Sequence, residues 1–212
     1  MEIRITRVKV CGLTRFEDAR IALEAGADML GFVVTGESPR RIDPEAAGEI
    51  VAALPRRAHA VAVMVGPTPD EALRHARTVG AASVQLHRVD PLAWPHDFPL
   101  PVAISVPVDA AGRLTIALPA THVMIHLDAA DPDRAGGTGR TFPWESVIQI
   151  GSAHQIMLAG GLGPDNVAAA IEAVVPFAVD ASSRLESAPG LKDARLVRRF
   201  LRAARQAATR HV

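Results

Sequence analysis

The chain alternates short runs of β-branched and aliphatic residues with longer amphipathic stretches, and this alternation constrains its fold more than any other feature. Each apolar run is roughly four to eight residues long and bounded by Gly, Pro or Asp, as buried parallel strands usually are. The predicted strands cover residues 5–10, 29–34, 59–65, 83–86, 101–108, 122–127, 155–158 and 177–179. Eight strands with helical crossovers in 212 residues predict one α/β domain over residues 1–212, a single (β/α)8 TIM barrel.

A doubly wound parallel sheet is the main alternative to the barrel. Such a sheet would usually have six or seven strands, and the chain lacks the glycine fingerprint that follows the first strand of many such sheets. Both differences favour the barrel.

Capping residues mark helices between the strands. The predicted helices cover residues 14–25, 43–54, 68–80, 163–174 and 192–208. Thr14 and Glu17 have the spacing of a capping box, and Asp43 precedes a proline at the first helical position. The crossovers at residues 90–98 and 109–119 are rich in proline and are expected to contain little helix.

The charge balance excludes several classes of partner. The chain has 23 basic and 23 acidic residues, so it lacks the basic excess of a nucleic-acid binder. No apolar run approaches the length of a membrane-spanning helix, and no signal-peptide core is present, so we expect a cytoplasmic protein without membrane attachment. A single cysteine, Cys11, excludes an internal disulfide and suits a reducing compartment.

The eight histidines give no convincing metal site. His122 and His126 fall on the same side of a predicted strand as Asp128, but residues four apart on a strand are separated by about 13 Å. That distance is too great for one ion, so we expect no metal.

In a TIM barrel, active-site residues lie at the carboxyl ends of the strands and in the loops that follow. In this chain those places hold Cys11, Arg40, His87, Asp128, Gly160, Gly161, Asp180, Ser182, Ser183 and a glycine-rich run at 136–139. The loops after strands seven and eight commonly bind phosphate, and here they carry the paired glycines and serines. The pattern predicts an enzyme that acts on a phosphorylated small molecule.

Seven motifs resemble the phosphoribosylanthranilate isomerase family, and they occur in order from residue 9 to residue 193. They are KVCGLT at 9–14, GAD with GFV at 26–33, SPR at 38–40, VQLH at 84–87, LD with GGTG at 127–139, AGGL with NV at 159–167, and VDASS with the later Glu186, Pro189-Gly190 and Lys192-Asp193 at 179–193. GGL or SPR alone would be weak, but seven motifs with barrel spacing cover almost the whole chain.

The resemblance implies a cofactor-free Amadori rearrangement of a phosphosugar in tryptophan biosynthesis, by a monomer or homodimer. It implies that Cys11 is the general base, that Asp128 is the general acid and that Arg40 binds the anthranilate carboxylate. It further implies that Gly160, Gly161, Ser182 and Ser183 bind the phosphate, that His87 and Asp180 contact the substrate, and that residues 136–139 form a flap.

The residues supply a physical reason for the two proton-transfer roles. Lys9 lies two residues before Cys11, hence on the same side of the strand, and an ammonium group there would favour the thiolate. Asp128 must be protonated to act as an acid, which requires a raised pKa in a poorly solvated site.

Four residues depart from the family pattern near the substrate. Arg184 and Arg88 stand where Gly is usual, His126 stands where an apolar residue is usual, and Val34 stands where an aromatic residue is common. They leave open a paralogue that isomerises, or only binds, a related phosphosugar. The histidine-pathway isomerase for an aminoimidazole ribonucleotide is a further alternative, but it usually has Asp at the position of Cys11.

Overall fold

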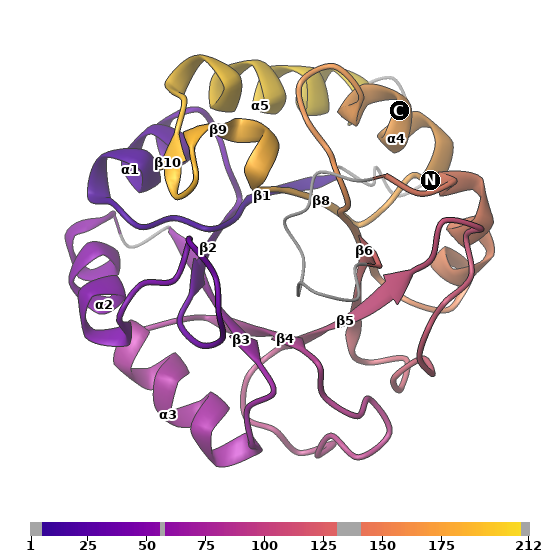
Figure 1. Cartoon of the computed structure of the whole chain (residues 1–212), viewed down its shortest axis with the longest axis horizontal. Coiled ribbons are helices and arrows are strands. Elements are labelled where there is room, and N and C mark those ends of the chain that lie inside the picture. Colours follow the sequence, from indigo (N-terminus) through magenta and orange to yellow (C-terminus); the bar gives the residue numbers. More distant parts are fainter. Residues whose placement is uncertain (1–5, 56–57, 131–140, 209–212) are drawn as a thin grey trace.

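A computed structural model describes residues 6–55, 58–130 and 141–208. Its central element is a closed barrel in which strands β1 to β8 pair in chain order, each parallel to the next, and β8 pairs with β1 (Figure 1). The strands are β1 Arg7–Val10, β2 Met29–Val33, β3 His59–Val65, β4 Ser83–His87, β5 Val102–Val108, β6 Met124–Ala129, β7 Ile156–Leu158 and β8 Ala178–Ala181. The predicted TIM barrel is confirmed.

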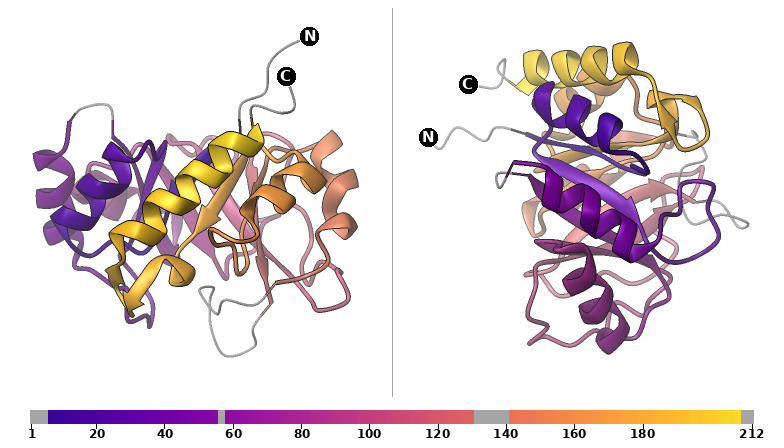
Figure 2. Two further views of the ribbon diagram at one scale, coloured as in Figure 1. Left: turned by 90° about the horizontal axis from the view of Figure 1, so that it is seen from above. Right: turned by 90° about the vertical axis from the view of Figure 1, so that its left-hand side faces the viewer.

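Helices surround the barrel except between β4 and β5 and between β5 and β6, where the described residues form none (Figures 1 and 2). They are α1 Phe16–Glu24, α2 Pro44–Ala53, α3 Pro69–Val79, the 3₁₀ helix η1 Trp144–Ser152, α4 Val167–Val174, the short 3₁₀ helix η2 Ser183–Leu185 and α5 Ala194–Ala208. Residues 88–101 and 109–123 form turns instead of helix, as their prolines predict. No helix in the described ranges is long and apolar enough to cross a membrane.

The predicted starts of the second and third helices are confirmed, with a capping side chain at each, whereas the capping box predicted at Thr14 is wrong. The Asp43 carboxylate accepts hydrogen bonds from the second and third amides of α2, and Thr68 forms a capping box with Glu71 at the start of α3. Thr14 forms no such box. Its hydroxyl donates to the Gly190 carbonyl at 2.7 Å, so a long-range contact replaces the local one and α1 begins two residues later than predicted.

Two further elements differ from the prediction. Helix α4 begins at Val167 and not at 163, because the intervening residues form the loop that follows β7. A small hairpin that was not predicted lies between β8 and α5. It consists of β9 Glu186–Ala188 and β10 Leu191–Lys192. It brings Glu186 and Lys192 next to the barrel mouth.

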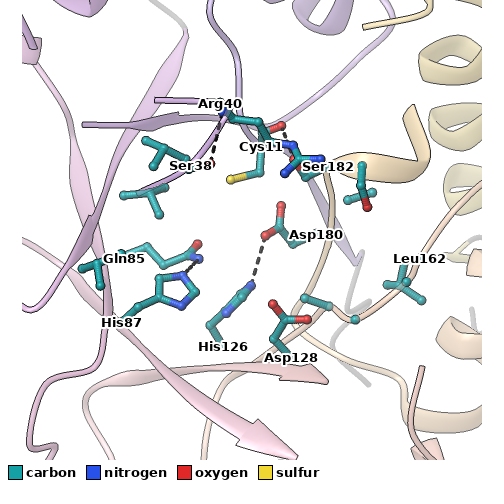
Figure 3. Close-up of a pocket in the computed structure, with 18 of the residues that line it drawn as sticks. Cys11, Ser38, Arg40, Gln85, His87, His126, Asp128, Leu162, Asp180 and Ser182 are labelled. Carbon is teal, nitrogen blue, oxygen red and sulfur yellow. Dashed lines mark hydrogen bonds and ion pairs between the residues drawn. The ribbon is translucent and has the colours of Figure 1, made fainter. Parts of the chain in front are cut away.

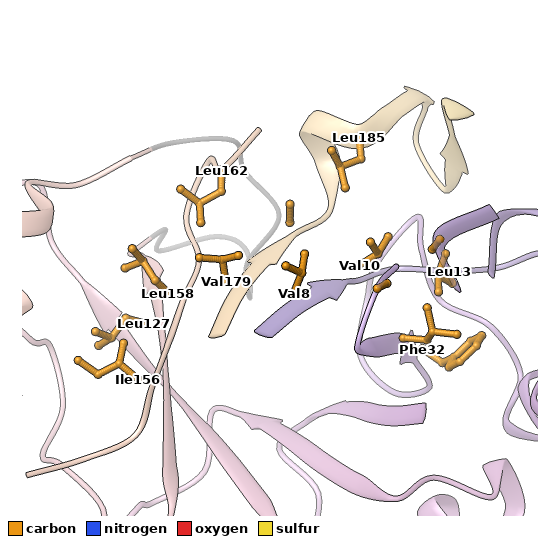
Figure 4. Close-up of a cluster of buried hydrophobic side chains, with 14 of the residues drawn as sticks. Val8, Val10, Leu13, Phe32, Leu127, Ile156, Leu158, Leu162, Val179 and Leu185 are labelled. Atoms are coloured by element: carbon orange, nitrogen blue, oxygen red, sulfur yellow. The ribbon is translucent and has the colours of Figure 1, made fainter. Parts of the chain in front are cut away.

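The outward side chains of the strands form one continuous apolar layer beneath the helices (Figure 4). On β6, for example, Ile125 and Leu127 are completely buried in this layer. The inward side chains differ with depth. The lower barrel is filled by apolar residues such as Met29, Val61 and Met157, whereas polar side chains occupy the levels above them. Apolar side chains therefore fill the lower part of the barrel interior, and the polar side chains that could take part in chemistry lie near its mouth.

Candidate active site

A pocket opens where the strands end, and every residue predicted for the site lines it (Figure 3). These residues are Cys11, Arg40, His87, Asp128, Gly160, Gly161, Asp180, Ser182 and Ser183. The predicted flap at 136–139 lies outside the described residues. His122, considered above as a metal ligand, is exposed and precedes β6, so it does not share a strand face with Asp128.

Cys11 follows β1 directly, and its amide donates to the Ala181 carbonyl of β8 at 2.9 Å. Its buried thiol lies beside the Lys9 ammonium, in space that Gly31 of β2 leaves open. A Cβ atom at Gly31 would lie 2.8 Å from the Cys11 sulfur and 2.9 Å from Lys9 Nζ. The thiol and the ammonium can be neighbours because position 31 has no side chain.

The pKa of the Cys11 thiol is raised above its ordinary value, contrary to the prediction. Burial raises it most, and the Lys9 ammonium lowers it without compensating fully. Lys9 is itself completely buried, and contacts with Asp180 and Cys11 hold its pKa above the ordinary value although burial opposes this. Lys9 is therefore the main charged group that limits the energetic penalty of forming a thiolate here, with a smaller contribution from Lys192.

Asp128 lies at the end of β6 with its carboxyl group buried. Burial raises its pKa most, and nearby Asp180 adds to the effect, whereas His126 and the amide of Ala129 oppose it. The Ala129 amide donates to Asp128 Oδ1 at 2.9 Å. The raised pKa is in the direction that a general acid requires.

A buried polar network crosses the barrel between these two groups. Asp180 Oδ2 accepts from Lys9 Nζ at 3.1 Å and lies 3.0 Å from His126 Nε2, while His126 Nδ1 lies 3.2 Å from Ser105 Oγ (Figure 3 shows Asp180 and His126). Burial would raise the pKa of Asp180, but Lys9 and His126 lower it to about 2, so the group is a carboxylate. Its second oxygen, Oδ1, is buried and has no hydrogen-bond partner among the described residues.

His126 is thus a partner of Asp180, and it also lowers the pKa of Asp128. Sequence reasoning placed it on the side of Asp128 but could not identify Asp180 as its partner, because that residue is 54 positions away. The pairing depends on barrel closure, which no local pattern encodes.

His87, at the end of β4, presents a neutral imidazole. Burial and the neighbouring His126 lower its pKa to about 3. The side-chain amide of Gln85 lies 3.0 Å from His87 Nε2, and the His87 ring stands edge-on to that of His126 at 5.5 Å. Gln85 was missed as a site residue. Its alternation with His87 along β4 is the signal that could have revealed it.

Arg40 is held in a fork geometry by Glu186. Arg40 Nε and Nη2 each donate to one oxygen of that carboxylate at 2.8 Å, and Lys192 Nζ donates to it at 2.7 Å. The two cations share one anion, so this buried cluster has an excess positive charge beside the pocket. Arg40 Nη1 has no hydrogen bond to a described residue. The neighbouring Arg41 is exposed and does not line the pocket.

The loops after β7 and β8 present backbone amides to the pocket. Gly160 and Gly161 have φ of +81° and +62°, a conformation that favours glycine. The amides of Gly160, Gly161 and Ser182 make no hydrogen bond to a described residue, and the Ser182 hydroxyl donates to the Cys11 carbonyl at 3.0 Å. These loops could therefore accept an anion.

The two arginines at positions where the resemblance leads us to expect glycine are accommodated differently. Arg88 adopts φ of +54°, so the backbone there is left-handed although the residue carries a side chain. Arg184 is not among the described residues with positive φ, and its side chain extends to Gly161 and Asp165. Position 184 therefore does not require glycine for backbone reasons.

Comparison with known proteins agrees with this geometry. The family model "N-(5'phosphoribosyl)anthranilate (PRA) isomerase" matches residues 8–203. An N-(5'-phosphoribosyl)anthranilate isomerase of Geobacter sp. (strain M21) is 44% identical over 203 residues, which cover 95% of this chain and 99% of the relative.

Solved structures give the same result. The phosphoribosyl anthranilate isomerase of Thermotoga maritima superposes with a TM-score of 0.82 at 35% identity, covering 95% of this chain and 99% of the other. A phosphoribosyl anthranilate isomerase in complex with reduced 1-(o-carboxyphenylamino)-1-deoxyribulose 5-phosphate gives 0.76 at 32% identity, with the same coverage. The chain belongs to the N-(5'-phosphoribosyl)anthranilate isomerase family.

Proposed function

We propose that the protein converts N-(5-phosphoribosyl)anthranilate into 1-(2-carboxyphenylamino)-1-deoxyribulose 5-phosphate in tryptophan biosynthesis. The observation that carries the proposal is the placement of Cys11 and Asp128 in one pocket, with the carboxylate of Asp180 between them (Figure 3). A thiol and a carboxyl group facing one substrate supply the base and the acid that an Amadori rearrangement needs.

The reaction begins with ring opening. Asp128, whose pKa burial raises, gives its proton to the furanose ring oxygen as the bond from that oxygen to C1 breaks. The lone pair of the anthranilate nitrogen forms a double bond to C1, which gives a protonated Schiff base. The raised pKa of Asp128 supports this role, because an ionised carboxylate has no proton to give.

The second step moves the C2 proton. The Cys11 thiolate removes it, and the electrons of the C–H bond form a C1–C2 double bond while the Schiff-base nitrogen becomes neutral. The resulting enolamine becomes the ketone when the C2 hydroxyl loses its proton and C1 gains one. Lys9 supports this step, because its ammonium favours the thiolate within a buried site.

The remaining groups fit the two ends of the substrate. Arg40 keeps the Nη1 end of its guanidinium available for the anthranilate carboxylate while Glu186 fixes its orientation. The amides of Gly160, Gly161 and Ser182, with Ser183 beside them, bind the phosphate. Asp180 Oδ1 accepts a hydrogen bond from a sugar hydroxyl, and the His87 imidazole contacts the substrate. A reactive thiol suits the reducing cytoplasm.

The test follows the loss of phosphoribosylanthranilate fluorescence with the purified protein. We expect turnover by the wild type, and a decrease in kcat of about 10³-fold for Cys11→Ser and for Asp128→Asn, within the range for loss of a general acid or base. Asp90→Asn, which changes an exposed loop carboxylate away from the pocket, is the matched control and keeps wild-type turnover.

The outcomes separate the function from the roles. No turnover by the wild type, or a preference for the aminoimidazole ribonucleotide of the histidine pathway, would contradict the proposed function. Turnover undiminished in the Cys11→Ser variant would leave the function intact and remove Cys11 as its base.

A further inference from the structure

We propose that Arg184 is a positioning residue that ties the loop after β7 to the loop after β8, so that their amides hold the substrate phosphate in one geometry. This inference rests on the phosphate site of the proposed function. The β7 loop is defined as residues 159–165 and the β8 loop as residues 182–184. Both loops line the pocket, through residues 159–162 and through Ser182 and Ser183, but no ladder hydrogen bond joins them.

The Arg184 guanidinium spans the gap between the loops. Nη1 donates to the Gly161 carbonyl at 3.1 Å, and Nη2 donates to the two oxygens of Asp165 at 2.8 and 2.7 Å. Gly163 provides the room for this arrangement, because a Cβ atom there would lie 3.0 Å from Arg184 Nε and 3.2 Å from Arg184 Cβ. The side chain therefore lies against the β7 loop along its length.

The carbonyl that Arg184 holds belongs to the phosphate-binding backbone. The same Gly161 oxygen accepts from Asn166 Nδ2 at 3.0 Å, and Asn166 Oδ1 accepts from the Gly163 amide at 2.8 Å. Asn166 thus shapes the β7 loop from within, whereas Arg184 connects it to the β8 loop. Because the C=O and the following N–H of a trans peptide point in opposite directions, holding this carbonyl fixes the direction of the Leu162 amide.

The Leu162 amide belongs to a residue that lines the pocket. Like those of Gly160 and Gly161, this N–H makes no hydrogen bond to a described residue. An anion bound by several amides requires all of them to converge, so a rotation of one peptide weakens the whole set. Arg184 acts on the phosphate through this peptide.

The alternative is that Arg184 simply attracts phosphate by its charge. Two observations favour positioning: Arg184 does not line the pocket, and its charge is matched by the Asp165 carboxylate. The two mechanisms predict opposite effects for Asp165→Asn. That substitution increases the net positive charge beside the site, so attraction by charge would strengthen phosphate binding, whereas loss of the Asp165 contact would weaken it.

The experiment measures kcat, KM for phosphoribosylanthranilate and competitive inhibition by inorganic phosphate in three variants. For Arg184→Ala we expect KM and the phosphate inhibition constant to rise about tenfold, with kcat within about twofold of wild type. Asp165→Asn should shift both constants in the same direction by about threefold. Arg184→Lys should not restore the wild-type values, because one ammonium cannot reproduce the guanidinium fork.

Arg113→Ala is the matched control. It removes an exposed Arg–Asp pair within a loop at the same end of the barrel, and neither residue lines the pocket. Both constants should stay at wild-type values, and thermal unfolding of all variants reports whether a fold defect contributes.

Each result supports or overturns the positioning role. Tighter phosphate binding by Asp165→Asn, or full rescue by Arg184→Lys, would show that charge is responsible. Unchanged constants in Arg184→Ala would show that the link is unimportant, even if wild-type turnover confirms the function. A wild-type enzyme that turns over substrate but is not inhibited competitively by phosphate would instead overturn the phosphate site itself. Asp165→Asn keeps the test decisive if Arg184→Ala fails to fold.

Discussion

The two faces of strand β6 differ in what they require of their surroundings. Ile125 and Leu127 point outward into an aliphatic layer, where burial stabilises them without regard to direction. His126 and Asp128 point inward, where each polar atom needs a partner or carries a penalty. Stability and chemistry are thus assigned to alternate residues of one strand, and substitutions on the two faces should have separable effects.

The largest effect on stability is expected for Lys9→Met, which breaks the inner network. It leaves the buried Asp180 carboxylate without its ammonium partner, and removal of one member of a buried pair destabilises a protein by about 4 kcal/mol. Urea unfolding measures this loss. Arg20→Met, which removes an exposed pair with Glu24 on α1, is the control and should lose less than about 0.5 kcal/mol.

Lys9→Met should also change how the stability of the protein depends on pH. In the wild type the pKa of Asp180 falls from 3.8 to about 2 on folding, so its contribution is present above about pH 4 and is lost as the pH falls towards 2. Lys9→Met should lose much of this dependence. A destabilisation no larger than that of Arg20→Met would contradict the importance of the network.

Leu127→Ala tests the outer face of the strand. Its side chain is completely buried, so its truncation should reduce the free energy of unfolding by about 3 kcal/mol through lost burial and a cavity. The kcat of the folded fraction should stay within about twofold of wild type, because the inner face is unchanged. A fall in kcat comparable to that of Asp128→Asn would show that the two faces are not separable.

The smallest expected effect is an increase in stability, for the Asp128→Asn substitution. Burial raises the pKa of Asp128 above its value in the unfolded chain, so the native state binds this proton more tightly, and the stability present below about pH 4 is lost as the pH rises towards the raised value. Asp128→Asn should therefore unfold at a higher urea concentration near neutral pH, by roughly 1 kcal/mol, while losing activity. The difference should vanish below pH 4. Equal stability of the two proteins at neutral pH would argue against a penalty at this site.

The fold and most of the pocket could be predicted because they depend on periodic features. Strand alternation places Cys11, His87 and Asp128 at strand ends, and barrel closure brings strand ends together. Local caps were predictable where the partner was close, as at Asp43 and Thr68.

What the sequence did not predict depends on competition between contacts made by residues far apart in the chain. Thr14 bonds to Gly190 and not to its own helix, and Asp180 pairs with two residues from other strands. The pKa of Cys11 depends on burial against one ammonium, and the sequence shows the ammonium but not the extent of burial. Such competition is settled only by tertiary packing.

The absence of a side chain at Gly31 couples strand β2 to the side chains of strand β1 and the residue that follows it. A larger group at position 31 would displace both the thiol and the ammonium, so strand β2 limits which base strand β1 can carry. A bulkier base in place of Cys11 would have to fit into the same small space beside Gly31. Positions 9, 11 and 31 should therefore change together or not at all, and redesign of the catalytic base should begin on the neighbouring strand.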